Sequence, residues 1–200
     1  MFDDVFRPRF ARVVAPVGRA LISWGITPSL VTWAGFGLAL AGAGAIAAGY
    51  PLSGLALWLL SRVADGLDGV IARESRRQSA FGGYLDITLD MAAYSAMVLA
   101  FSSRHPEHAL LWQVVLAGYV LAITTTLAFS AAAERAQQAL APGNRTFQFT
   151  RGLAEAGETT LIYALWVLFP SYVAPLGWAW CGLLFATAVQ RSWLAWRHLP

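Results

Sequence analysis

The sequence predicts an all-α membrane protein, a bundle of six transmembrane helices preceded by an amphipathic helix in the membrane interface. Of its 200 residues, 58% are hydrophobic and only 12% are charged, whereas about a quarter of the residues of a soluble domain are charged. The hydrophobic residues form long runs, and the mean hydropathy is +0.55. Six crossings of roughly 20 residues each fit this length as a single domain, 1–200.

The interfacial helix is expected within residues 1–25. Hydrophobic side chains recur at helical spacing between Phe6 and Leu21, and Arg9, Arg12 and Arg19 fall on another face. This pattern is typical of a helix that lies in the interface, with its arginines toward the lipid headgroups. The alternative is a cytoplasmic segment that simply precedes the first span, because the pattern depends on few residues.

Six hydrophobic segments follow as the expected membrane spans. They cover about 28–48, 51–72, 81–103, 109–133, 152–169 and 172–193. Every arginine except Arg62 and Arg104 lies in the N-terminal segment, the 73–80 loop, the 134–151 loop or the C-terminal segment. Because positive residues concentrate on the cytoplasmic side of a membrane, both termini are predicted to be cytoplasmic.

Charged side chains interrupt two neighbouring spans near this cytoplasmic boundary. They are Arg62, Asp65 and Asp68 in the second span, and Asp86 and Asp90 in the third. The two acids of each span are three or four positions apart and so share a helix face. If the two faces meet, the four carboxylates lie together. Arg62 is expected to pair with Asp65, with contact to lipid or to an acceptor as the alternative.

Four carboxylates in a low-dielectric site must be protonated or must bind cations. Oxygen ligands suit Mg²⁺ or Mn²⁺, and four carboxylates are enough for two ions. A two-metal site can clamp a diphosphate and stabilise displacement at phosphorus. The residues therefore indicate metal-assisted phosphoryl-type transfer at the membrane surface. The alternative is a structural role in which the acids only pair with Arg62, Arg73 and Arg76.

The acids belong to a longer pattern that resembles the signature of the CDP-alcohol phosphotransferases, D-x-x-D-G-x-x-A-R-x8-G-x3-D-x3-D. All of its fixed positions are matched, by Asp65, Asp68, Gly69, Ala72, Arg73, Gly82, Asp86 and Asp90. One departure lies before the first span, where family members often have Pro-Asn and this chain has Pro28-Ser29. A nucleotide contact at that position is therefore left open.

The resemblance implies a metal-dependent phosphatidyltransferase of phospholipid synthesis. It would move a phosphatidyl group from CDP-diacylglycerol to a small alcohol and release CMP. Asp65, Asp68 and Asp86 would be the principal metal ligands, and Asp90 would contact a metal and act as the general base. The residues implied to bind CDP and its diphosphate are Asp65, Gly69, Ala72, Arg73 and Gly82. A homodimer in a bacterial inner membrane, with a cytoplasmic active site, is also implied.

The acceptor site is expected around the start of the fifth span. Arg145 and Arg151 flank this span, and the resemblance implies a role in binding an acceptor phosphate, for which the planar guanidinium is suited. Glu155 and Glu158 are candidates for binding acceptor hydroxyls. The alternatives are positive-inside topology for the arginines and ion pairing for the glutamates. Glycerol 3-phosphate is the expected acceptor, with inositol phosphate, serine or another polyol left open.

Two other functions are compatible with clustered intramembrane acids. A membrane prenyltransferase also binds a metal diphosphate through aspartate-rich motifs, but those motifs lack the Gly-x-x-Ala-Arg continuation. A cation or proton carrier would use the acids as binding sites, but it gives no reason for Gly69, Ala72 and Arg73. His105 and His108 flank Pro106 in a loop on the opposite side and are expected to be solvated.

Overall fold

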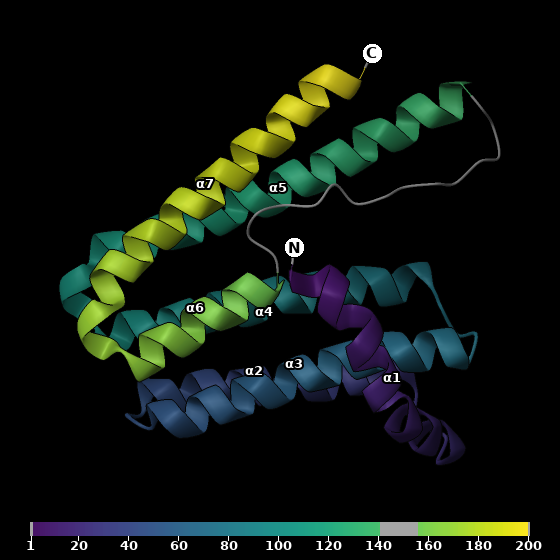
Figure 1. The fold of residues 1–200 in the computed structure, drawn as a ribbon, viewed down its shortest axis with the longest axis horizontal. Coiled ribbons are helices and arrows are strands. Elements are labelled where there is room, and N and C mark those ends of the chain that lie inside the picture. Colours follow the sequence, from purple (N-terminus) through teal and green to yellow (C-terminus); the bar gives the residue numbers. More distant parts are fainter. Residues whose placement is uncertain (1, 141–155, 200) are drawn as a thin grey trace.

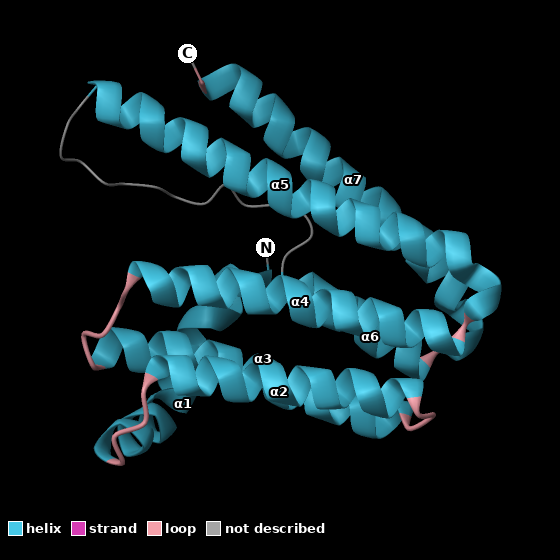
Figure 2. Cartoon of the chain, turned by 180° about the vertical axis from the view of Figure 1, so that it is seen from behind, coloured by secondary structure: helices cyan, strands magenta, loops and turns pink. Residues whose placement is uncertain are grey.

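The computed structural model describes the backbone of residues 2–140 and 156–199, and the side chains of 13–135 and 156–199. Within these ranges the chain is helical and contains no strand, which confirms the all-α class (Figures 1 and 2). The α-helices are α1 (Phe2–Ser23), α2 (Pro28–Ala47), α3 (Pro51–Glu74), α4 (Ala80–Arg104), α5 (Ala109–Leu140), α6 (Ala156–Leu168) and α7 (Val173–His198). Single 3₁₀ turns, η1 (Pro106–His108) and η2 (Pro170–Tyr172), precede α5 and α7.

Local sequence signals fix several helix ends. Thr27 caps α2, because its hydroxyl accepts a hydrogen bond from the amide of Leu30, and proline at the next position has the backbone angle that a helix start requires. Ser79 caps α4 in the same way by accepting from the amide of Gly82 at 3.0 Å. The connection from α2 to α3 turns at Gly49, whose φ of +92° is accessible to glycine at little cost.

The helices form two groups. In both ribbon views α2, α3, α4 and α6 run side by side, whereas α5 and α7 form a pair that is tilted away from them (Figures 1 and 2). α2 packs against both α3 and α4, and α1 crosses α3. The core between the groups is aromatic and includes the fully buried side chains of Trp58, Trp112, Tyr163 and Trp166.

Small residues bring helix pairs close together, as membrane packing requires. A Cβ atom on Gly54 of α3 would lie 2.7 Å from the carbonyl oxygen of Gly42 in α2. A Cβ atom on Gly177 of α7 would lie 2.6 Å from a Leu111 methyl group in α5. Gly35 and Gly42 of the first span also face α3 closely, so these two glycines have a packing role within one chain, whereas Gly37 and Gly44 meet nothing within 4 Å.

By length and composition, four segments of the described chain can cross a membrane: Pro28–Ala47, Ala80–Arg104, Pro106–Arg135 and Pro170–His198. The described part of α6 is a shorter apolar helix of 13 residues. α3 has 24 residues but contains charged residues of the candidate site. The six-span count therefore stays a prediction, although the expected spans and the observed helices overlap throughout the described residues.

α1 coincides with the helix expected within 1–25, and its described side chains, from residue 13 on, contact the rest of the fold. Val14 is buried, and Arg19 pairs with Glu74 at the end of α3 at 3.5 Å. Gly18 faces Val70 of α3. Its amphipathic, interfacial character stays a prediction, but its packing places it beside the end of α3 that carries the motif.

Candidate active site

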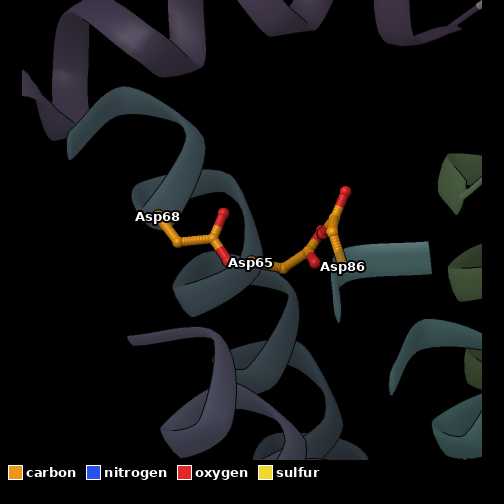
Figure 3. A group of neighbouring side chains, drawn as sticks. All are labelled: Asp65, Asp68 and Asp86. Carbon is orange, nitrogen blue, oxygen red and sulfur yellow. The ribbon is translucent and has the colours of Figure 1, made fainter. Parts of the chain in front are cut away.

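Three of the four motif acids lie together, between the C-terminal half of α3 and the N-terminal part of α4. Asp65 and Asp68 project from one face of α3 toward Asp86 on α4 (Figure 3). One carboxylate oxygen of each lies within 4.8 Å of the others. Mg²⁺ binds oxygens at about 2.1 Å, so opposite ligands of one ion are about 4.2 Å apart. Small side-chain adjustments would thus let the three carboxylates share a divalent ion, and all-oxygen ligands are those that Mg²⁺ and Mn²⁺ prefer.

The three carboxylates differ in their access to solvent. Asp68 is buried, with 8% of its surface exposed, Asp65 is half-buried, and Asp86 is exposed. The carboxylate of Asp68 accepts a hydrogen bond from the hydroxyl of Thr32 in α2, with 2.5 Å between Oγ1 and Oδ2. The cluster is therefore anchored to α2 at its buried side and open at Asp86.

Asp90 lies outside this group of three and contacts Arg62. The guanidinium Nη1 of Arg62 donates to Asp90 Oδ1 at 2.7 Å, whereas its distance to Asp65 Oδ2 is 3.9 Å. The expected pairing with Asp65 is thus present but is the longer of the two. Long side chains in a helix lean toward its N-terminus, and Arg62 accordingly lies 4.5 Å from the ring centroid of Trp58, one turn earlier.

The remaining motif residues surround the same end of α3 and α4. A Cβ atom on Gly69 would lie 3.3 Å from the guanidinium of Arg73, so these two residues are neighbours on α3. Arg73 is exposed and Ala72 is half-buried. Gly82 is in the first turn of α4, where Ser79 caps it. The residues implied to bind CDP therefore lie beside the carboxylate cluster, and their contact with a nucleotide stays a prediction.

A cavity of about 230 Å³ lies next to the cluster, between α4 and the helices α5, α6 and α7. Its polar side chains are those of Asp86, Asp90, Tyr94, Tyr119, Thr126, Thr159 and Arg191. Arg191 of α7 is 8% exposed, and its Nη1 donates to the carbonyl oxygen of Ala122 at 3.0 Å. The cavity thus combines two carboxylates of the motif with a buried cation.

Sequence reasoning missed Arg191 as a candidate, because it counted this residue only among the cytoplasmic arginines. A signal was available: Arg191 falls inside the expected last span, 172–193, just as Arg62 falls inside the second. Thr32 was also missed. It is 36 residues from Asp68, and a lone threonine in a hydrophobic span carries no pattern that indicates a partner.

The expected acceptor residues are only partly placed. Arg145, Arg151 and Glu155 lie outside the described residues. Glu158 is in the first turn of α6, next to Thr159 of the cavity wall.

His105 is at the opposite end of α4 from Asp86, and its Nδ1 lies 3.2 Å from Glu107. His105 therefore lies in the loop as expected, but its side chain is half-buried rather than fully solvated.

Comparison with known proteins gives matches over nearly the whole chain. Residues 25–191 match the CDP-alcohol phosphatidyltransferase family. The chain is 34% identical to the inner membrane protein YnjF of Escherichia coli, over 96% of this chain and 94% of that protein. It is 27% identical to an archaetidylinositol phosphate synthase of Methanothermobacter thermautotrophicus, over 97% and 94%. A phosphatidylinositol phosphate synthase of Cutibacterium acnes is 35% identical over 54% and 53%.

Solved structures share the fold. The phosphatidylinositol phosphate synthase of Mycobacterium tuberculosis with CDP-DAG bound has a TM-score of 0.68 at 24% identity, covering 94% of this chain and 96% of that one. The complex of the same enzyme with manganese and citrate has a TM-score of 0.65, at 24% identity and with coverage of 94% and 90%. With its complete motif and family match, the chain belongs to the CDP-alcohol phosphatidyltransferases, membrane enzymes of phospholipid synthesis that transfer substituted phosphate groups.

Proposed function

We propose that this chain transfers a phosphatidyl group from CDP-diacylglycerol to an inositol phosphate and releases CMP, in a bacterial inner membrane. The observation that carries the proposal is the cavity in which Asp86 and Asp90 share a wall with the buried cation Arg191. Such a cation suits an acceptor that carries a phosphate. Relatives from Methanothermobacter and Cutibacterium are synthases of inositol phosphate lipids. This likeness favours inositol phosphate over glycerol 3-phosphate, the acceptor expected from the sequence.

The donor would bind at the end of α3 and α4. Asp65, Asp68 and Asp86 would hold Mg²⁺ or Mn²⁺, which would neutralise the diphosphate and stabilise the charge on departing CMP. A relative's structure with manganese supports this choice of ion. Arg73, exposed beside Gly69, is placed to meet an anionic part of CDP. A second ion and the metal contact implied for Asp90 stay predictions from the sequence, because Asp90 lies outside the group of three carboxylates and its Oδ1 is bound by Arg62.

The acceptor would occupy the cavity, with its phosphate toward Arg191 and a hydroxyl toward Asp90. Asp90 takes the proton of that hydroxyl, and the oxygen forms a bond to the phosphorus on the lipid side of the diphosphate. The bond between this phosphorus and the bridging oxygen breaks, and CMP leaves with the electron pair. The cavity supports this arrangement because Asp90 and Arg191 line the same space.

The proposal is tested by CMP release from CDP-diacylglycerol with Mn²⁺ or Mg²⁺, using purified protein in lipid–detergent micelles. The acceptors compared are inositol phosphate, inositol, glycerol 3-phosphate and serine, with Asp90→Asn as the control for background hydrolysis. Release that depends on inositol phosphate is the expected result. Release with serine or with unphosphorylated inositol alone would contradict the assignment of a phosphorylated acceptor. Release with glycerol 3-phosphate alone would restore the acceptor expected from the sequence.

The proposed topology has a cytoplasmic active site and both termini in the cytoplasm, and the proposed assembly is a homodimer. Topology is supported by the arginine distribution, and the inner membrane by the named Escherichia coli relative. The alternative functions of prenyl transfer and ion transport are set aside, because the chain belongs to a family that catalyses a different reaction.

A further inference from the structure

We propose that Arg62 is a positioning residue that reserves Asp90 for proton transfer. It would hold one carboxylate oxygen of Asp90 and keep this side chain apart from the three carboxylates that bind metal. The inference rests on the proposed function, since it requires Asp90 to be the general base. Arg62 is outside the family motif, which begins at Asp65.

The contact between the two residues is short and specific. Arg62 Nη1 donates to Asp90 Oδ1 at 2.7 Å and bridges α3 to α4. This bond engages Oδ1, which leaves Oδ2 as the oxygen that can meet a hydroxyl in the cavity. Both side chains are mostly shielded, with exposed fractions of 13% for Arg62 and 23% for Asp90. Shielding from water strengthens a charge-assisted hydrogen bond and slows its exchange.

The guanidinium is itself fixed by its neighbours. Its carbon lies 4.5 Å from the ring centroid of Trp58 and 5.5 Å from that of Tyr94. Its Nε donates to the hydroxyl of Ser61 at 3.3 Å. Trp58 and Ser61 are fully buried. A planar guanidinium held against aromatic faces keeps its orientation, which an ammonium on a flexible stem does not.

Tyr94 connects this cluster to the acceptor cavity. It is one turn after Asp90 on α4, packs against Arg62, and lines the cavity that Asp90 also lines. The same packing that orients Arg62 therefore forms part of the wall against which an acceptor would rest. A base acts efficiently only when its oxygen is within hydrogen-bond reach of the proton. Holding Asp90 in place should therefore increase kcat and leave substrate affinity nearly unchanged.

The arrangement divides four carboxylates into two kinds. Asp65, Asp68 and Asp86 face one another within 4.8 Å, and Asp90 is compensated by a cation built into the chain. Without Arg62, the negative charge of Asp90 would lose the cation that now lies beside it, and a bound metal ion would attract it as a fourth ligand. We therefore expect loss of Arg62 to reduce turnover while metal-dependent binding of CDP-diacylglycerol is retained.

The test measures kcat, the acceptor KM and Mn²⁺-dependent CDP-diacylglycerol binding for Arg62→Gln and Arg62→Lys. Arg62→Gln should lower kcat by about a hundredfold, with KM and donor binding within about twofold. Arg62→Lys keeps the charge but loses the planar contacts, so it should recover part of kcat. Arg19→Gln is the matched control: it removes an arginine that also pairs with an α3 carboxylate, Glu74, and neither residue lines the cavity.

A double-mutant cycle then separates positioning from structure. The slow CMP release that remains in Asp90→Asn is measured over long incubations. If Arg62 acts through Asp90, the double variant with Arg62→Gln should release CMP at the same rate as Asp90→Asn alone. Additive losses would overturn the proposal, as would unchanged kcat in Arg62→Gln or loss of donor binding together with kcat. Should Arg62→Gln fail to fold, wild-type kcat in Arg62→Lys would overturn it. Full activity in Asp90→Asn would instead refute the base assignment itself.

Discussion

The hydroxyl of Thr32 in α2 donates a 2.5 Å hydrogen bond to the carboxylate of Asp68 in α3. The same hydroxyl lies 3.1 Å from the carbonyl oxygen of Pro28, one turn earlier in its own helix. Asp68 is the most deeply buried acid of the cluster. Partners of this kind orient a metal ligand without touching the metal, so a residue of the first apolar span supports the site on α3 and α4.

Thr32→Val should weaken Mn²⁺-dependent binding of CDP-diacylglycerol by about tenfold or more, because the buried carboxylate loses its oriented donor. Valine has nearly the same shape as threonine, so helix packing is retained. The measurement is a titration of donor binding against Mn²⁺ concentration. Thr32→Ser retains a hydroxyl and should bind as the wild type does; equal affinities in all three proteins would show that the bond has no role in the site.

Asp90→Asn should abolish turnover, by at least about a hundredfold, while it retains most of the CDP-diacylglycerol binding. An amide of the same shape cannot take a proton from the acceptor. The comparison variant is Asp65→Asn, which should weaken metal binding itself because Asp65 belongs to the group of three carboxylates. The measurement pairs CMP release with Mn²⁺ titration. Normal CMP release in Asp90→Asn would remove this residue from the mechanism.

Arg191→Gln should raise the KM for inositol phosphate by roughly tenfold to a hundredfold, because a hydrogen bond to a charged group contributes about 1.5–3 kcal/mol. Donor binding should change little, since Arg191 lies in the cavity wall rather than in the motif. Steady-state kinetics at saturating donor give the KM. Arg197→Gln is the control, because Arg197 stacks on Trp193 and is exposed. A KM that is unaffected by Arg191→Gln would place the acceptor phosphate elsewhere.

Gly54→Ala should destabilise the fold by about 1–3 kcal/mol through overpacking between α2 and α3. The new Cβ would lie 2.5 Å from Ile46 Cγ1 and 2.7 Å from the backbone oxygen of Gly42, and backbone atoms cannot move aside cheaply. Thermal unfolding in detergent gives the difference. Gly37→Ala in α2 is the matched control, because its Cβ would meet nothing within 4 Å, and its stability should be unchanged or slightly higher.

Helix periodicity made much of the site predictable from the sequence. Asp65 and Asp68 share a face because they are three positions apart, and Asp86 meets them because α3 and α4 run in opposite directions. The predicted helix boundaries were also close to the observed ones, since proline, glycine and capping residues separate the apolar runs. The number of membrane-spanning helices was harder to predict, because α3 is long enough to cross a membrane but contains charged residues.

Contacts between distant side chains were not predictable in the same way. Spacing placed Arg62 next to Asp65, but the arginine leans toward Trp58 and forms its shorter contact with Asp90. That direction depends on an aromatic residue one turn back and on the position of α4. The buried contact of Arg191 with Ala122 joins residues 69 positions apart, and only the packing of α5 on α7 brings them together.

Access to water increases across the carboxylate cluster, from Asp68, which Thr32 holds, through Asp65 to Asp86. In the proposed metal site, a hydrated cation would therefore meet the exposed Asp86 first and the buried Asp68 last. Because Thr32 holds Asp68 in place and Asp86 is open to water, we expect the ion to load from Asp86 inward and to exchange its water molecules for carboxylate oxygens one after another.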